Sequence, residues 1–165
     1  MEKNNYILIL KEDLKKKNLI LDKIILANQK QADALDDPNL DPDDFDHIVE
    51  EKANLIEQLE KLDDGFEQVY ARVREELQDN KDAYKEDIAL MQKMIRQLTD
   101  KSATIQVQEM RNKDKMTQKF AAIKKQVREI RSSQKVVNQY YRNMMKTNYI
   151  DPQFWTTRSS VFWMQ

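Results

Sequence analysis

The sequence predicts an all-α protein: an antiparallel bundle of three long helices with coiled-coil-like packing, whose third helix is the longest and overhangs the other two. Turn-forming residues are scarce, because the 165 residues include one Gly and three Pro, which leaves few corners for a sheet. Apolar residues recur three and four positions apart, the spacing of one helix face. A hydrophobic share of 40% beside a charged share of 35% is typical of amphipathic rods.

The first helix is predicted over residues 4–34. Its apolar face is marked by Ile7, Leu10, Leu14, Leu21 and Ile24. The pattern stops at DDPNLDPDD, residues 36–44, where Pro38 and Pro42 predict a turn. Asp41 directly precedes Pro42 and is the predicted N-cap of the next helix.

The second helix is predicted over residues 42–78 and carries the most regular stripe in the chain. Its members are Phe45, Ile48, Lys52, Leu55, Leu59, Leu62, Phe66, Val69 and Val73. Lys52 is the one polar interruption of this heptad pattern. Gly65 lies inside the stripe without shifting its phase. It indicates a bend, a close approach of another helix, or a tolerated weak position that costs roughly 0.5–1 kcal/mol relative to Ala.

The third helix is predicted over residues 81–147, a stretch without Pro or Gly. Its stripe begins with Tyr84, Ile88, Met91, Ile95, Leu98, Ser102 and Ile105. The pattern is lost over QEMRNKDK, residues 108–115, and resumes at Met116, Phe120, Ile123, Val127, Ile130, Val137, Tyr141 and Met144. Residues 1–148 thus form one helical domain, and residues 149–165 form an aromatic C-terminal tail.

The predicted helices differ greatly in length. A helix of about 65 residues is about 95 Å long, and the first helix is only about half as long. Because short connections make neighbouring helices antiparallel, the first two helices cover only the near half of the third. Residues 116–145 then lack a partner within the chain, so their apolar stripe must fold back, dimerise or bind another protein.

Charge is distributed unevenly along the chain. Residues 33–87 hold 20 acidic and 6 basic side chains, a net charge of −14, whereas residues 111–146 hold 11 basic and 2 acidic ones, a net charge of +9. A basic helix can bind nucleic acid, but here the basic residues flank a continuing apolar stripe. We therefore expect an acidic protein surface, in this chain or in a partner, rather than nucleic acid.

Residues for familiar chemistry are missing from the sequence. His47 is the only histidine and there is no cysteine, which excludes multi-histidine and thiolate metal sites and histidine-based catalytic triads. The Asp cluster around Pro42 lacks the glycine and the terminal glutamate of an EF-hand loop. We expect no enzyme activity, cofactor or metal. The apolar runs are shorter than a membrane span and the N-terminus does not resemble a signal peptide, so a cytoplasmic protein without membrane insertion is expected.

Methionine and tyrosine gather towards the C-terminus, where flexible Met side chains suit an adaptable binding surface. The residues interpreted in this way are Met110, Met116, Tyr140, Tyr141, Met144 and Met145. For Met91 and Met94 we expect ordinary core packing.

Three segments carry a resemblance to a known family. They are EKANLIEQLEKLDDGFEQVYARVREEL at residues 51–77, LTDKSATIQVQEMRNK at residues 98–113, and RSSQKVVNQYYRNMMKTN at residues 131–148. Over about residues 1–153 the chain resembles the FlgN family of flagellar export chaperones in its Gram-positive form. The resemblance rests on helical patterns and not on catalytic residues.

The resemblance implies a cytoplasmic chaperone of the flagellar type III export system that binds unassembled hook-filament junction proteins and delivers them to the export gate. The family's C-terminal helical region binds the substrate, which here implies a partner-binding face of Phe120, Ile123, Val127, Ile130, Val137, Tyr140, Tyr141 and Met144. Tyr140 or Tyr141 is also a candidate contact of the export gate. The sister chaperones of the filament cap have similar helical patterns. The alternative from another class is a structural coiled-coil adaptor that homodimerises through the distal part of the third helix.

The tail departs from the family pattern, since TTRSSVFWMQ follows a point where a short polar ending is expected. Three interpretations stay open for residues 155–165. The tail covers the partner-binding face, docks a partner of its own, or has no role.

Overall fold

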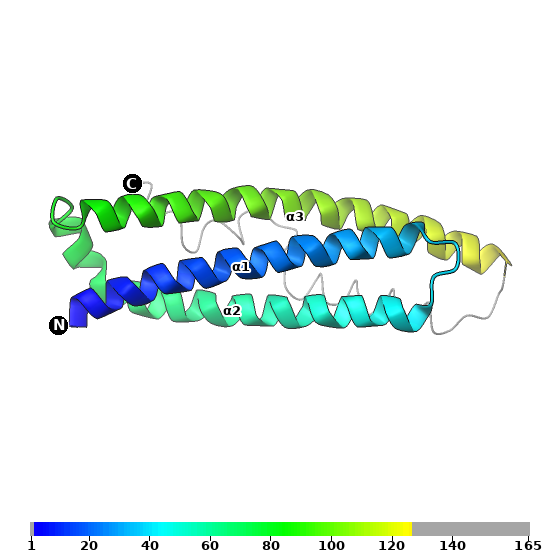
Figure 1. The fold of residues 1–165 in the computed structure, drawn as a ribbon, viewed down its shortest axis with the longest axis horizontal. Coiled ribbons are helices and arrows are strands. Elements are labelled where there is room, and N and C mark those ends of the chain that lie inside the picture. Colours follow the sequence, from blue (N-terminus) through cyan, green and yellow to red (C-terminus); the bar gives the residue numbers. More distant parts are fainter. Residues whose placement is uncertain (1, 127–165) are drawn as a thin grey trace.

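The computed structural model describes residues 2–126 of the chain, and these residues fold into three helices (Figure 1). They are α1 (Glu2–Asp36), α2 (Pro42–Asp79) and α3 (Lys85–Gln126). The predicted all-α bundle with consecutive helices antiparallel is confirmed. At 42 residues α3 is the longest of the three, and Figure 1 shows its C-terminal end, in yellow, extending past the turn between α1 and α2.

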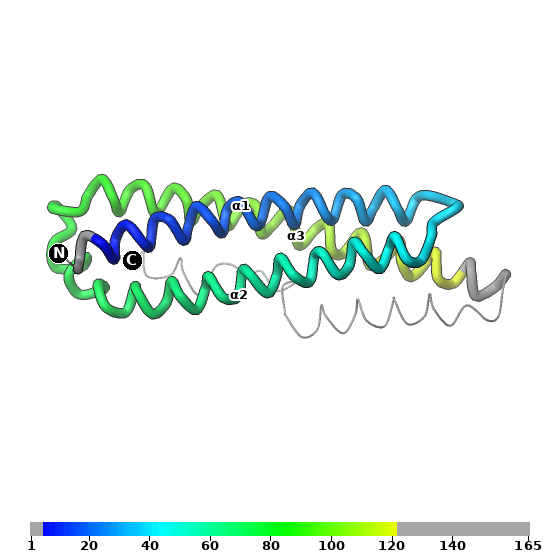
Figure 2. The backbone as a smooth tube through the Cα atoms, turned by 60° about the horizontal axis from the view of Figure 1, so that its bottom comes forward, coloured from blue at the N-terminus to red at the C-terminus, as the bar shows by residue number. Residues whose placement is uncertain are grey.

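The helix α1 lies between the other two. It runs antiparallel to α2, since Tyr6 contacts Arg72 and Lys17 contacts Asp63, and parallel to α3, where Asn18 lies at Met94. Both α2 and α3 pack directly against α1, but over the described helices no Cα of α2 comes within 8 Å of a Cα of α3. Figures 1 and 2 show the same arrangement from two directions. The described helices therefore occupy three corners of a square, with α1 at the corner between the other two.

One hydrophobic core runs the length of the bundle. The predicted stripe of the first helix is confirmed, because its five members are all at most 3% exposed. In α2 the stripe residues Ile48, Leu62 and Val69 are only half-buried. The positions that directly follow them, including Val49, Asp63 and Tyr70, are buried instead. The buried face of α2 is therefore rotated towards α1 relative to the predicted stripe.

The turn between α1 and α2 follows the prediction. The Asp41 carboxylate accepts a hydrogen bond from the Asp43 N–H at 2.9 Å, and Pro42 is the first helical residue. Acidic side chains in the first turn of α2 also suit the positive end of the helix dipole.

The predicted start of the third helix at residue 81 is wrong. The helix α2 ends at its C-cap, Asn80, whose N–H makes the last helical bond to the Glu76 carbonyl at 3.1 Å and whose side-chain amide donates to the same carbonyl at 3.1 Å. The Asn80 carbonyl then accepts the N–H groups of Ala83 and Tyr84, which closes a turn before α3 begins at Lys85. A polar side chain that bonds to nearby backbone competes with helix formation, which explains the shift. The predicted course of residues 127–147 and the aromatic tail lie outside the described residues.

Gly65 lies inside a continuous α2 and is not a close-approach site. A Cβ built at Gly65 meets no atom within 4 Å among the described residues. Of the interpretations considered, the tolerated weak position fits this geometry.

We expect Gly65→Ala to stabilise the protein by about 0.5–1 kcal/mol, because Ala restricts the unfolded chain and no native contact opposes its methyl group. Urea denaturation followed by circular dichroism measures this difference. A destabilised variant would show that the position needs glycine.

Candidate partner-binding site

The distal end of α3 is anchored on the C-terminus of α1. The Lys115 ammonium pairs with both oxygens of Asp36 at 2.8 and 3.0 Å. Lys119 donates to the Leu35 carbonyl at 3.2 Å and also to the Asp37 carbonyl. The last turn of α1 contains no basic residue of its own, so the Leu35 and Asp37 carbonyls at this end are satisfied by Lys119, about 80 positions away in the sequence. The stretch of α3 that leads to the predicted binding face is thereby fixed to the bundle.

Replacing Lys119 with Met is expected to destabilise the bundle by about 0.5–1 kcal/mol, because the negative end of the α1 dipole loses its cation. The matched control is Lys93→Met, since Lys93 is exposed on the same helix. Chemical denaturation of both variants measures the difference. Equal stability of the two would contradict the capping role.

One side of the bundle, between α2 and α3 and away from α1, is bordered by two rows of side chains, one on α2 and one on α3. On α2 the row that includes Asp63 faces α1, because Asp63 pairs with Lys17. The row on the opposite flank of the helix therefore faces away from α1, and it consists of Ile48, Leu55, Leu62 and Val69. On α3, Lys101 and Lys115 pair with Asp22 and Asp36 of α1, so the flank of α3 that carries these lysines faces α1. The opposite flank of α3 carries Ile88, Ile95, Ser102 and Phe120. We call these eight residues the fourth face.

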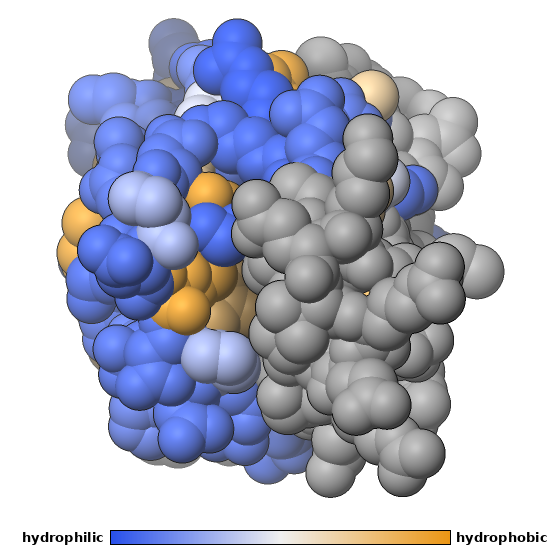
Figure 3. Space-filling model, turned by 90° about the vertical axis from the view of Figure 1, so that its right-hand side faces the viewer, coloured by the Kyte–Doolittle hydropathy of each residue, from blue (hydrophilic) through white to orange (hydrophobic). Residues whose placement is uncertain are grey.

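The fourth face is mainly apolar. Leu55, Ile95 and Ser102 are buried, whereas Ile48, Leu62, Val69, Ile88 and Phe120 are half-buried. Figure 3 views the bundle from the end near the turn between α1 and α2 and shows apolar surface between hydrophilic residues at that end. An apolar side with no helix between α2 and α3 among the described residues suits the apolar side of an amphipathic helix.

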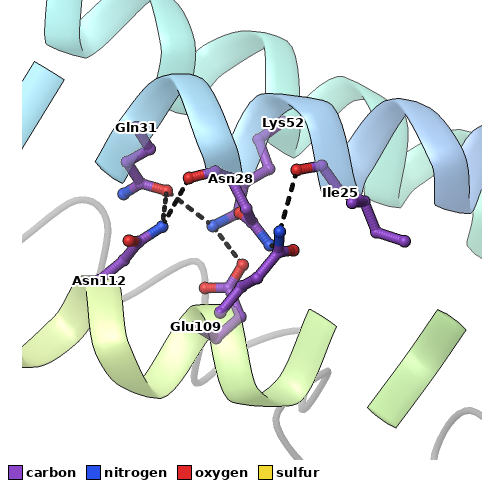
Figure 4. A network of polar contacts seen from close by, with 7 residues as sticks. Ile25, Asn28, Gln31, Lys52, Glu109 and Asn112 are labelled. Carbon is purple, nitrogen blue, oxygen red and sulfur yellow. Dashed lines mark hydrogen bonds and ion pairs between the residues drawn. The ribbon is translucent and has the colours of Figure 1, made fainter. Parts of the chain in front are cut away.

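A layer of mostly buried polar side chains links the three helices (Figure 4). We call it the polar layer, and it comprises Asn28, Gln31, Lys52, Gln108, Glu109 and Asn112. Lys52 and Glu109, only 2% and 0% exposed, form an ion pair that links α2 to α3. Lys52 also donates to the Gln31 Oε1 at 3.2 Å.

The amides of the polar layer tie α3 to α1. Asn112 donates to the Asn28 carbonyl at 3.0 Å, and Asn28 donates to the Gln108 side chain at 3.1 Å. Gln108 in turn donates to the Ile25 carbonyl at 3.2 Å. Because amides bonded to one another and to backbone groups allow few registers, the polar layer fixes the axial alignment of the helices.

Burial lowers the pKa of Lys52 below its ordinary value of 10.5, and this effect outweighs the opposing attraction of the Glu109 carboxylate. Two atoms of the layer, Asn28 Oδ1 and Gln31 Nε2, are buried without a hydrogen-bond partner among the described residues. Buried polar atoms left in this state reduce stability, so the polar layer gives alignment at the expense of stability.

The lowered pKa of Lys52 has a measurable consequence. At pH values between that lowered pKa and the ordinary pKa of 10.5 in the unfolded chain, Lys52 is protonated more often in the unfolded chain than in the folded chain. The free energy of unfolding therefore rises with pH through this window, relative to a Lys52→Met variant that lacks the group. Denaturation midpoints of the two proteins from about pH 7 upward measure this difference. Parallel pH curves would contradict it.

Most of the predicted partner-binding residues lie outside the described residues. Phe120 is half-buried on the fourth face of α3. Ile123 belongs to α3, but its side chain is outside the described part. Val127, Ile130, Val137, Tyr140, Tyr141 and Met144 lie beyond Gln126.

The methionine interpretation is confirmed in part. Met91 and Met94 are buried in the core as expected. Met116 is only 2% exposed, so its assignment to an exposed binding surface is wrong. It lies one turn before Phe120 on the face of α3 that points into the bundle. Met110, 56% exposed, lies on the outer side of α3.

The polar layer was not predicted as a unit, although the sequence carries a trace of it. In the sequence, Lys52 interrupts the apolar stripe of the second helix, and the stripe of the third helix is lost over residues 108–115. Those residues contain Glu109 and Asn112, and α3 continues through them without a break. Polar residues at core positions of two predicted helices were the signal that could have indicated a shared layer.

No other kind of site is found in the described part of the chain. Within residues 2–126 there is no group of three or more His, Asp or Glu side chains placed to hold a metal ion. None of the described helices combines the length and apolar character required to cross a bilayer. Comparisons of the chain with protein-family models, with curated proteins and with solved structures find no match.

Proposed function

We propose that this protein is a cytoplasmic, non-enzymatic export chaperone of the FlgN type. It binds unassembled flagellar hook-filament junction proteins through the C-terminal amphipathic segment and delivers them to the flagellar type III export apparatus. The observation that carries the proposal is that the apolar stripe of the third predicted helix extends beyond the part of α3 that packs against α1. The distal end of α3 is anchored at Lys115 and Lys119, while the apolar pattern of the sequence continues past Gln126 to Met144.

The chemistry of binding follows from these residues. An amphipathic helix of the partner buries its apolar side against Phe120, Ile123 and the apolar positions that follow. Basic side chains flank this stripe and attract acidic residues of the partner without nucleotide hydrolysis. The resembling segments 51–77 and 98–113 lie on α2 and α3, so the resemblance covers part of the bundle as well as part of the binding segment.

Light scattering tests the proposal. The full chain is measured alone and with terminal fragments of hook-filament junction proteins and of the filament cap. A stoichiometric complex with a junction fragment is expected, and Val137→Asp or Tyr141→Asp should abolish it. The matched control, Val107→Asp, should bind normally because Val107 is 47% exposed on the outer side of α3. Binding of the cap fragment alone would assign the protein to the sister chaperones.

The alternative adaptor function predicts a different result. Opposite charges within one chain, −14 over residues 33–87 and +9 over residues 111–146, would also suit two copies that pair through the distal segment. A constant dimer mass that no flagellar fragment changes, and that Ile130→Asp abolishes, would favour the adaptor and contradict the chaperone.

A further inference from the structure

The fourth face is the most informative surface that the described helices leave without a function. Lys52 of α2 and Glu109 of α3 reach each other across the interior while the two backbones stay more than 8 Å apart. This is the diagonal relation of a four-helix bundle. The corner opposite α1 is bordered by Ile48, Leu55 and Leu62 on one side and by Ser102 and Phe120 on the other.

We propose that residues 127–147 of the same chain occupy this corner in the free protein and complete a four-membered bundle. The inference does not depend on the chaperone function. If that function holds, a partner must displace the segment to reach its apolar stripe.

The position where α3 ends favours this occupant over a separate chain. Lys119 contacts the end of α1 at Leu35 and Asp37, and α2 begins five residues later at Pro42. Gln126 lies seven residues, about 10 Å of helix, beyond Lys119, so the chain leaves α3 just past the start of the fourth face. A helix of 21 residues is ~31 Å long, against ~57 Å for the 38 residues of α2. The segment is long enough for the distal half of the face, where the polar layer lies.

Charge and heptad spacing also match. The helix α2 carries 13 acidic and 4 basic side chains, a net charge of −9. Residues 127–147 carry 1 acidic and 5 basic ones, a net charge of +4. Returning from the end of α3, the segment runs in the same direction as α2. Ile48, Leu55 and Leu62 recur every seven positions, as do Ile130, Val137 and Met144, so the two rows have the same spacing and can pair.

Engineered cysteines test the proposal, because the natural chain contains no cysteine that would interfere. Val137→Cys is combined in the full chain with Ile48→Cys, Leu55→Cys or Leu62→Cys, and disulfide formation is followed on non-reducing gels. The control pair is Val137→Cys with Asn54→Cys, because Asn54 is exposed next to Leu55 on the outer side of α2. Circular dichroism verifies that each variant is folded.

The expected result is an intramolecular disulfide at one pair of the row, while the Asn54 pair stays mainly reduced. Tethering gives an effective concentration near the millimolar range, so at micromolar protein this link should form about a thousandfold faster than any link between chains. Links between two chains would assign the face to a second copy and overturn the proposal. Absence of a link at all three row positions, or equal linking at Asn54, would overturn it as well.

Discussion

Replacing Lys52 with Ala is expected to lower the free energy of unfolding by about 3–5 kcal/mol, because the change leaves the Glu109 carboxylate buried without its cation. Glu109 is fully buried, and an ionised carboxylate in that environment is strongly unfavourable without an opposite charge. Glu109→Ala should have an effect of similar size, since it leaves the Lys52 ammonium without its partner. Urea denaturation of the three proteins at neutral pH measures both effects.

The double variant Lys52→Met, Glu109→Met is the control for this prediction. It removes both charges at once and fills similar volume with apolar atoms, so we expect a stability equal to the wild type or higher by about 1–4 kcal/mol. The helices of the double variant should nevertheless lose part of their unique alignment, which broadened amide signals in an NMR spectrum would reveal. A Lys52→Ala variant as stable as the wild type would contradict a buried pair at this position.

Replacing Phe66 with Ala is expected to destabilise the bundle by about 3–5 kcal/mol, because the change leaves a cavity in the middle of the core. The Phe66 ring is 2% exposed and stacks on Tyr70 with ring centroids 6.2 Å apart. The Lys17 ammonium lies 5.6 Å from the centre of the same ring, and this cation also pairs with the buried Asp63. The substitution therefore removes aromatic and cation-π contacts together with apolar volume.

Two further variants define the source of this effect. Phe66→Leu keeps most of the volume and loses the ring, so we expect a smaller loss of stability than with Ala. Leu19→Ala removes an apolar side chain that is 61% exposed on α1, and we expect a change within about 0.5 kcal/mol. Thermal and urea denaturation measure all three. Similar losses for Phe66→Ala and Leu19→Ala would show that the core is not where the structure places it.

The fold was predictable because its signals are local. Residues such as Leu14 and Leu21 recur at helical spacing on one face, and burial of that face is the main stabilising term in a bundle of amphipathic helices. Asp41 before Pro42 predicted the start of α2 in full, because capping involves neighbouring residues only. The start of α3 was misplaced, since the side-chain amide of Asn80 also bonds to the backbone, an interaction that helix propensity does not describe.

The candidate site was less predictable. The stripe of α2 was identified from spacing, but which of its flanks is fully buried depends on where α1 lies. Val49 is buried and Ile48 half-buried for this reason. The assignment of Met116 to a binding surface was wrong because the sequence does not specify how far along α3 the core extends.

By itself, the sequence determined the helical class, the number of helices within residues 2–126, the first turn and the positions of most apolar stripes. These properties depend on residues within a few positions of one another. Only the tertiary structure decided that Lys52 pairs with Glu109, that Lys119 caps α1, and that α2 and α3 stay apart around a fourth face. Each of these relations joins residues 57 or more positions apart. They depend on the relative placement of whole helices, which spacing within one helix does not encode.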